Sequence, residues 1–364
     1  MPMTSSLPPL HLSGVVLPDG VRRDIWVADG RISFTEVPGA RTIATDVWIL
    51  PGLVDAHCHI GIGPGGPITD LAEAEQQAIV ERDAGVFLIR DCGAPLDTSG
   101  LQGRADLPRI IRAGRHLARP KRYLRGFAID LEEPERLPEV VAEQVAYGDG
   151  WVKLVGDWID REIGDLAPLW PDDVLDQAVK VAHEAGGKVT AHVFGEAALP
   201  GLLAAGVDCI EHGTGLTDET IAEMVRRGIP LVPTLTNIAN FPDIAAQAVK
   251  YPVYAQHMLD LHRRNPDVIA ACIDAGVELF AGTDAGSVVA HGRIVDEIEL
   301  LHAAGLSTTE AIGAASWRAR EWLGYSGIVD GGEADLLAFD ADPREDIGVL
   351  RRPVCGVLRG AVVR

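Results

Sequence analysis

Short apolar runs alternate with longer amphipathic stretches through most of the chain, between residues 51 and 325. Eight of the apolar runs have the length and composition of buried strands, and most are bounded by Gly or Pro. Strands that alternate with helical patterns predict parallel βα units, so we expect an α/β fold with a (β/α)8 TIM barrel over residues 51–325. The eight predicted strands are residues 53–60, 85–91, 109–114, 151–157, 188–194, 208–213, 230–236 and 277–284.

The stretches between these runs carry helix start and stop signals. From Pro171 onwards apolar positions recur with helical spacing, and Gly186 ends the segment. Residues 217–228 and 307–324 behave in the same way, and each opens with a Thr or Ser suited to capping a helix. An open doubly wound sheet would have a glycine-rich phosphate turn after its first strand, which this sequence lacks, so a closed barrel is favoured.

Both ends of the chain have a different pattern. Residues 24–34 alternate between polar and apolar positions around an Asp29-Gly30 turn, which is typical of a β-hairpin. Residues 334–342 and 354–364 are two further strand-like runs. Because neither end is long enough to bury a core alone, we expect residues 1–50 and 326–364 to form one small β-sandwich-like domain together.

Composition narrows the class of protein. The chain has 364 residues and a formal net charge of −21 at pH 7, which argues against nucleic acid or an anionic membrane surface as a partner. No apolar run reaches the length of a membrane span, roughly 18 residues, and the first ten residues do not resemble a secretory signal. We therefore expect a cytoplasmic protein that acts on a small molecule. The sequence does not decide whether the protein forms homo-oligomers.

The histidines give the first indication of chemistry. Four of the eleven lie at or near the C-terminal ends of predicted strands, where the active sites of TIM barrels are built. A pair of histidines two residues apart on one strand points the same way, but such a short motif taken alone favours two hydrogen-bonded core residues. Four imidazoles at one end of a barrel instead favour a shared metal ion. These four are His57, His59, His192 and His212, whereas His183, His257, His262 and His302 are expected on the surface or in helix packing.

Two further residues fit a metal site. Lys153 lies in the middle of an apolar strand, where a buried ammonium beside a cation would be repelled and costly to desolvate. Either it pairs with an acid, or it is N-carboxylated by carbon dioxide and becomes an anionic ligand; the nearby histidines favour the second. Asp284 ends the eighth strand and, unless it only caps the next turn, is placed to contact a metal and to transfer protons. Asp55 is expected to support an imidazole from behind, and Cys58 to point away from its two histidine neighbours.

Four residues on the loops after the strands are expected to bind substrate. Two of them, Trp158 and Asn237, follow the fourth and seventh strands, and His291 follows the eighth. Tyr123 lies in the basic run of residues 118–126, which alternatively forms only a solvated face.

Taken together, the motifs PGLVDAHCHI, WVKLVGD, VTAHVFG, IEHGTG and AGTDAG resemble, in order and in strand position, those of the metal-dependent amidohydrolase superfamily. The segments STTEAIGAASWRAREWLG and GGEADLLAFDADP are also similar to its last helix and returning β-structure. Within the superfamily, the chain looks most like the branch that holds imidazolonepropionase-like enzymes and prolidase-like dipeptidases, which cleave Xaa-Pro, Xaa-Arg or Xaa-Lys bonds.

The resemblance implies a ligand set. His57 and His59 would bind the more buried metal, with Asp284 also in contact, and carboxylated Lys153 would bridge to a second metal held by His192 and His212. Many imidazolonepropionase-type relatives use one metal and no such lysine, so Lys153 favours two metals. Zinc is the default ion for these ligands, and manganese, iron or cobalt would also fit.

The expected function is metal-dependent hydrolysis of an amide C–N bond in a small substrate such as a dipeptide or an N-acyl amino acid, with Asp284 as the proton shuttle. The same site would also suit a cyclic amide, a lactone or a phosphotriester. A non-catalytic metal-binding protein is the alternative from another class.

Overall fold

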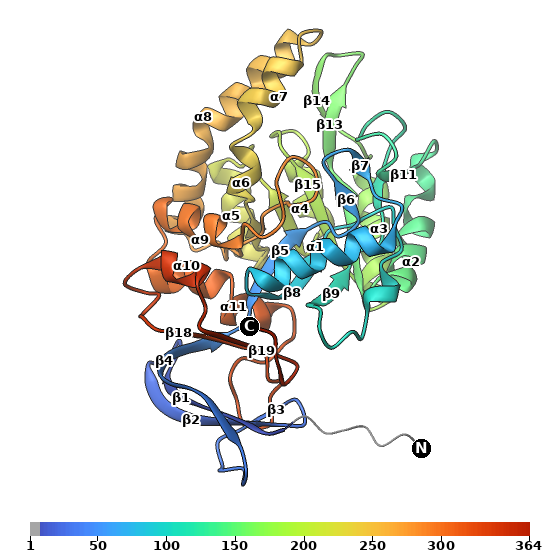
Figure 1. Ribbon diagram of the computed structural model, residues 1–364. Coiled ribbons are helices and arrows are strands. Elements are labelled where there is room, and N and C mark those ends of the chain that lie inside the picture. Colours follow the sequence, from blue (N-terminus) through green and yellow to red (C-terminus); the bar gives the residue numbers. More distant parts are fainter. Residues whose placement is uncertain (1–7) are drawn as a thin grey trace.

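A computed structural model describes residues 8–364 and confirms the α/β barrel (Figure 1). Its parallel strands surround the centre of the large unit, and helices cover their outer side. The regular barrel strands are β5 (Leu53–Cys58), β8 (Val86–Asp91), β9 (Arg109–Arg112), β10 (His116–Ala118), β12 (Trp151–Val155), β15 (Lys188–Val193), β16 (Cys209–His212) and β17 (Leu231–Val232).

Two barrel strands differ from their expected form. The third is interrupted after Arg112: its first part, β9, pairs with β8, and its second part, β10, pairs with β12. The eighth, near Leu279 to Ala285, forms only isolated bridges and single hydrogen bonds, including those from Phe280 N to Leu231 O and from Asp284 N to His57 O. These bonds join β17 to β5 and close the barrel.

Helices follow the strands and bury one face against them. Thr217 and Ser307 cap α5 and α10 with their side chains, as the sequence predicts, and Pro171 immediately precedes α3. The expected helix of residues 307–324 is broken at Ser316 into two pieces. The helices are α1 (Leu71–Asp83), α2 (Leu137–Tyr147), α3 (Asp172–Glu184), α4 (Leu199–Ala205), α5 (Asp218–Arg227), α6 (Leu235–Ile238), α7 (Phe241–Gln247), α8 (Pro252–Ala275), α9 (Ile294–Ala303), α10 (Thr308–Ala314) and α11 (Trp317–Trp322).

Short strands lie in the loops at the C-terminal end of the barrel. Two hairpins follow the first and fourth barrel strands, and the second of them projects beside α7 and α8 (Figure 1). These elements are β6 (Ile62–Gly63), β7 (Gly66–Pro67), β11 (Ala128–Asp130), β13 (Asp157–Asp160) and β14 (Asp165–Pro168).

The two chain ends meet in one seven-stranded sheet, in the order β20-β19-β18-β4-β1-β2-β3. Ile32 of β3, at one end of this order, and Val357 of β19, next to the other end, share one apolar cluster, so the sheet curls around its own core. Asp29 and Gly30, both with positive φ, form the tight turn between β2 and β3. The strands are β1 (Leu10–Val16), β2 (Val21–Ala28), β3 (Arg31–Ser33), β4 (Arg41–Pro51), β18 (Leu336–Phe339), β19 (Cys355–Leu358) and β20 (Ala361–Val362).

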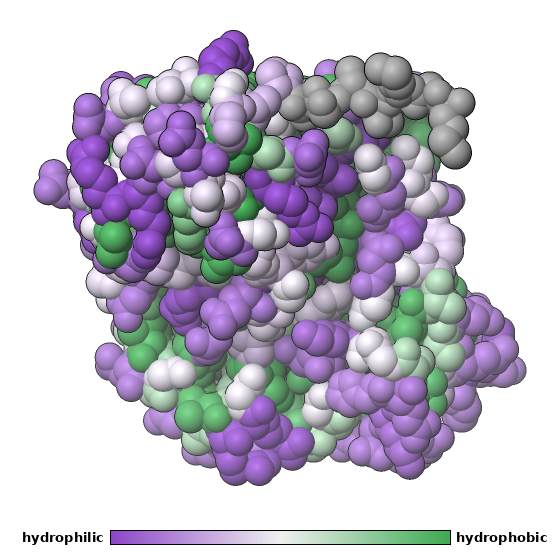
Figure 2. Space-filling view, turned by 90° about the horizontal axis from the view of Figure 1, so that it is seen from below, coloured by the Kyte–Doolittle hydropathy of each residue, from purple (hydrophilic) through white to green (hydrophobic). Residues whose placement is uncertain are grey.

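The surface seen from the side of this sheet is largely hydrophilic, with apolar residues in scattered groups (Figure 2). Within residues 8–364, none of the helices combines the length and the apolarity needed to cross a membrane.

The floor of the barrel is filled by side chains. Phe280 stacks on Trp322 of α11 with ring centroids 4.4 Å apart, and the Arg90 guanidinium lies over the rings of Trp151 and Trp322. The barrel is therefore packed at this level, and the polar residues gather above it, towards the C-terminal ends of the strands.

Candidate metal centre

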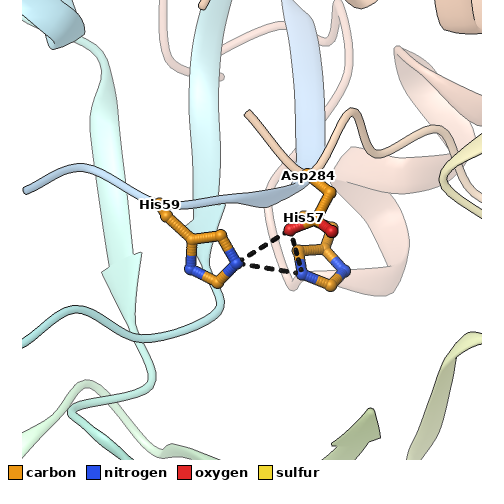
Figure 3. Close-up of side chains that lie close together, drawn as sticks. All are labelled: His57, His59 and Asp284. Atoms are coloured by element: carbon orange, nitrogen blue, oxygen red, sulfur yellow. Dashed lines mark hydrogen bonds and ion pairs between the residues drawn. The ribbon is translucent and has the colours of Figure 1, made fainter. Parts of the chain in front are cut away.

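Three side chains from the first and eighth strands form the middle of the site (Figure 3). The Nε2 atoms of His57 and His59 lie 3.2 Å apart. Asp284 Oδ1 is 3.2 Å from the first of these nitrogens and 2.9 Å from the second. Both imidazoles are buried. The predicted same-side placement of the two histidines thus brings two nitrogens and a carboxylate oxygen together.

The other ring nitrogen of each histidine is held from behind. His57 Nδ1 donates to Glu211 Oε2 at 2.7 Å, and His59 Nδ1 donates to the carbonyl of Gly93 at 2.7 Å. These bonds turn both Nε2 atoms towards Asp284. Asp55, expected in this supporting role, instead accepts from the His57 backbone N–H and from Thr283. Sequence reasoning missed Glu211, although an acidic residue inside an apolar strand beside His212 was a visible signal.

The carboxylate behind His57 remains charged. Burial alone would raise the pKa of Glu211, but the adjacent Arg90 guanidinium, 2.6 Å away, and the His57 ring hold that pKa well below its usual range. Thr190 donates to the same carboxylate. A fixed negative charge behind His57 makes its ring a stronger ligand.

Two more imidazoles complete the group. The rings of His192 and His212 are 4.7 Å apart, and that of His212 is 5.2 Å from His57. His212 Nδ1 is bonded to the Thr234 hydroxyl at 2.7 Å, whereas His192 Nε2 is buried without a partner. Burial, together with neighbouring positive groups, lowers the pKa of both rings well below the usual value. Both are therefore neutral, the form that binds metals.

Lys153 lies in the same group. Its side chain is 1% exposed, and Nζ is 3.4 Å from His57 Nε2. Over residues 8–364, no carboxylate approaches this amine within salt-bridge distance. A buried lysine here either pairs with an acid or is N-carboxylated. The geometry shows no acid close enough for the ion pair, and it is consistent with N-carboxylation.

Asp284 stands between the buried ligands and the opening of the site. Its side chain is 17% exposed, more than those of the histidines it contacts. Asn237 Nδ2 donates to its Oδ2 at 2.7 Å, which leaves Oδ1 for the two histidines. Burial would raise the pKa of Asp284, but its contacts with His57, followed by the hydrogen bond with His59, lower that pKa well below the usual range. The carboxylate is ionised and oriented.

The backbone is unusual where the last three barrel strands end. His212, Thr234 and Asp284 have φ values of 67°, 49° and 57°, a region that residues with a Cβ rarely occupy. Such strain clusters at functional sites. The eighth strand also approaches the first very closely, since a Cβ on Gly282 would lie 2.6 Å from the Cβ of His57. The glycine of the GTD motif is thus required for Asp284 to reach the histidines.

Sequence reasoning also missed His116, which begins the second half of the third strand. Its ring is 5.1 Å from that of His59 and is fully buried, and within the part of the chain that the structure describes neither ring nitrogen has a hydrogen-bond partner. Burial, and then the charge on His59, lowers its pKa well below the usual value, so the ring is neutral. The predicted strand ended at Gly114, two residues too early to include this histidine.

The four residues expected to bind substrate separate into two groups. Tyr123 and Trp158 lie against His192 with ring centroids 5.8 and 5.4 Å away, and Asn237 contacts Asp284. His291 lies elsewhere, on the outer side of the first strand. There its Nδ1 is 2.9 Å from Glu81 and 3.6 Å from the sulfur of Cys58, which points away from the centre as expected. Among the described residues, 8–364, the hydrogen bonds and ion pairs of the His291 ring reach Cys58 and Glu81 and none of the metal-ligand candidates.

The donor set fits divalent metal ions. Two imidazole nitrogens 3.2 Å apart, an amine 3.4 Å from one of them and the unpartnered His192 nitrogen all converge in one buried region. Buried nitrogens without partners are costly, and a cation bound by neutral imidazoles and carboxylates removes that cost.

Comparisons with known proteins agree with this centre. Residues 48–363 match the amidohydrolase family. The chain is 59% identical over 351 residues to an uncharacterized protein of Mycobacterium tuberculosis, covering 96% of this chain and 95% of that one. It is 26% identical over 229 residues to ochratoxinase of Aspergillus niger, covering 60% of this chain and 46% of that enzyme. A solved Xaa-Pro dipeptidase with bound methionine in its active site has the same fold, with a TM-score of 0.82 at 22% identity over 97% of this chain and 99% of that one.

Proposed function

The chain belongs to the amidohydrolase family and is a hydrolase that acts on C–N bonds, and from this premise we propose that it hydrolyses an amide bond in a small substrate, such as a dipeptide or an N-acyl amino acid, with bound divalent metal ions. The observation that carries the proposal is the meeting of His57 Nε2, His59 Nε2 and Asp284 Oδ1 within 3.2 Å of one another, in a buried group that also contains Lys153, His192 and His212.

In this proposal the ligands divide as their contacts suggest. His57, His59 and Asp284 would hold one ion, and His192 and His212 would hold a second. Lys153, if N-carboxylated, would supply a further anionic ligand beside them. When bound, divalent ions of this kind lower the pKa of a water molecule and polarise a carbonyl group. Zinc is the default, and manganese, iron or cobalt would suit the same ligands.

Asp284 is the proton carrier. Its carboxylate is ionised, it is held by Asn237 on one oxygen, and it is the most exposed member of its group. It is therefore placed to accept the proton of the attacking water and to return it to the leaving amine as the C–N bond breaks. No enzyme nucleophile is needed, because water forms the new C–O bond.

His116 supplies a hydrogen bond to the substrate. Its neutral ring must carry a proton on one nitrogen, and no protein acceptor takes it. The ring stands beside His59, where a carbonyl oxygen that gains negative charge during water attack would accept that hydrogen bond.

The test is turnover of a panel of dipeptides and N-acyl amino acids, with metal analysis of the same protein. Asp284→Asn should lower kcat by about 10²–10⁴-fold, because an amide cannot transfer the proton. The variant should keep most of its metal, since the histidines and Lys153 remain. Asp24→Asn, an exposed change in the small sheet, is the matched control.

Turnover by Asp284→Asn equal to that of the wild type would remove the proton carrier from the mechanism. Protein without any bound metal after incubation with zinc or manganese would contradict the proposed centre itself. Cyclic amides, lactones and phosphotriesters belong in the same panel, because the site chemistry would serve them equally.

A further inference from the structure

Aromatic rings occupy one side of the candidate centre, next to the third and fourth strands. Tyr123 is 4.9 Å from His116 and Trp158 is 5.4 Å from His192, measured between ring centroids. The two aromatic rings meet edge to face, 4.8 Å apart. One continuous apolar surface therefore lies beside both the proposed hydrogen-bond donor and one of the metal-ligand candidates.

The rings of this surface differ in exposure. Phe127 and Phe194 are buried, and they stand 6.3 Å behind Tyr123 and Trp158 respectively. Tyr123 and Trp158 themselves are only partly buried. Both supported rings thus keep some exposed surface, and they lie beside His116 and His192. Apolar and aromatic side chains around a few fixed polar groups are typical of small-molecule sites.

The surface is also fixed in position. Arg122 precedes Tyr123 in the chain and donates to the carbonyls of Trp158 and Ala167 at 3.1 and 2.8 Å, and to Asp160 at 2.9 Å. The loop that carries Tyr123 is thereby tied to the β13–β14 hairpin that carries Trp158. These bonds use both terminal nitrogens of the Arg122 guanidinium, so this cation is directed to the hairpin.

The surface carries no charge of its own. A tyrosine hydroxyl and a tryptophan indole are both uncharged at neutral pH. A charged substrate group placed here would lose its hydration without gaining a counter-ion, whereas a flat apolar group would gain contact area and edge or face contacts with the rings.

We propose that Tyr123 and Trp158 bind an aromatic or other large, flat apolar side group of the substrate. The enzyme would then prefer amides with such a group beside the scissile bond over those with a small or charged one. This inference rests on the proposed function, because it assigns a substrate class to the same site.

The experiment uses metal-loaded full-length protein and three matched series, X-Ala, Ala-X and N-acetyl-X, with X as Gly, Leu, Phe, Trp, Lys or Glu. For at least one series, kcat/KM for Phe or Trp should exceed that for Gly, Lys and Glu by about ten-fold or more. Trp158→Ala should reduce this preference to about three-fold or less, chiefly through KM, whereas Trp158→Phe should retain most of it. Trp26→Ala, which removes a half-buried tryptophan from the small sheet, is the control and should leave the preference unchanged.

The outcomes separate the two proposals. Hydrolysis with no preference, or with a preference for Lys or Glu in every series, overturns the aromatic surface and leaves the hydrolase standing. An equal loss for all X in Trp158→Ala overturns it as well. If no compound is hydrolysed, the proposed function fails, and calorimetric titration with N-acetyl-phenylalaninamide and N-acetyl-glycinamide decides the remaining question. Tighter binding of the first, lost in Trp158→Ala, supports the surface, and equal binding overturns it.

Discussion

Among the histidines of the centre, and within residues 8–364, His116 has both ring nitrogens buried without a hydrogen-bond partner, whereas in His192 only Nε2 is in this state. A buried polar group in this state destabilises the folded protein, and natural proteins keep such groups mainly where function requires them. His57 and His59 each have a partner behind the ring, as expected of ligands with a fixed orientation. His116 is therefore suited to meet a group that arrives with the substrate.

This difference leads to a prediction for His116→Phe. A phenyl ring fills similar space, so the unfolding temperature should stay the same or rise, since no hydrogen bond is lost. The loss of the donor should lower kcat by about 10²–10³-fold with metal content unchanged. Thermal denaturation, metal analysis and steady-state kinetics measure the three quantities.

The matched control is His302→Phe on the exposed face of α9, which should retain full activity. A His116→Phe enzyme with normal kcat would show that the ring only fills space. Loss of metal from that variant would instead indicate a ligand role.

At this scale the sequence predicted the residues that lie on regular strands and missed those that depend on irregular backbone. Strand periodicity and position were enough to place His57, His59 and His192 near one another, because the ends of adjacent parallel strands coincide. His116 follows a break in the third strand, and no periodic pattern crosses that break. The partner of His57 could not be assigned either, because the choice between Asp55 and Glu211 depends on how the side chains turn inside the barrel.

At the scale of elements, hydrogen bonds hold the β13–β14 hairpin against helix α8. His257 of α8 lies between two acidic residues. Its Nδ1 is 2.9 Å from Asp165 of the hairpin, and its Nε2 is 3.0 Å from Glu196, which follows β15. Tyr254 N also donates to the carbonyl of Gly164 at the hairpin tip. This contact fixes the hairpin that carries Trp158 over the site.

The contact of His257 with Asp165 and Glu196 should make the stability of the folded protein depend on pH. The hydrogen bonds with Glu196 and Asp165 raise the pKa of His257 from 6.5 to about 9, and the bond with His257 lowers that of Glu196 from 4.5 to about 2. A raised histidine pKa gives stability that is fully present below pH 6.5 and disappears as the pH rises through about 9. A lowered carboxyl pKa gives stability that is present above pH 4.5 and is lost as the pH falls towards 2.

We therefore expect His257→Gln to lower the Tm most between pH 4.5 and 6.5, with a difference from wild type that shrinks as the pH rises past 9. Thermal denaturation of both proteins at about pH 6, 7.5 and 9.5 measures this difference in Tm. His183→Gln removes the histidine of a more exposed pair with Asp208 and serves as the control. A difference that is constant over this range would contradict the charged state assigned to His257.

The sequence predicted the helices and strands but not the way in which the eighth strand closes the barrel. Residues 277–284 look like a buried strand, yet the structure contains only bridges and single bonds there. The chain must turn at Asp284, with φ 57°, and pass close to His57 at Gly282. Irregularity here is what brings Asp284 to the histidines, and hydrophobic periodicity carries no signal for it.

At the scale of the whole molecule, the metal-ligand candidates tie distant parts of the chain together. They lie on the first, fourth, fifth, sixth and eighth strands, so the residues between the first and last ligand, 57 and 284, form most of the barrel. Ions that bind this group bind only the folded chain, because the unfolded chain scatters the ligands. Bound metal must then raise the stability of the entire barrel.

Removal of the metal should therefore lower the Tm of the whole protein in one transition rather than melt a single loop. With free metal at about 1,000 times its Kd, a single site adds roughly 4 kcal/mol, which for a chain of this size corresponds to about 5 °C. Thermal denaturation before and after dialysis against a chelator measures the shift, and re-addition of zinc should restore the original Tm. His192→Asn should show a smaller shift, because one ligand of the second ion is gone, whereas His262→Asn on α8 should show the full one. An unchanged Tm after complete removal of the metal would mean that these strands do not share it, and the proposed centre would have to be abandoned.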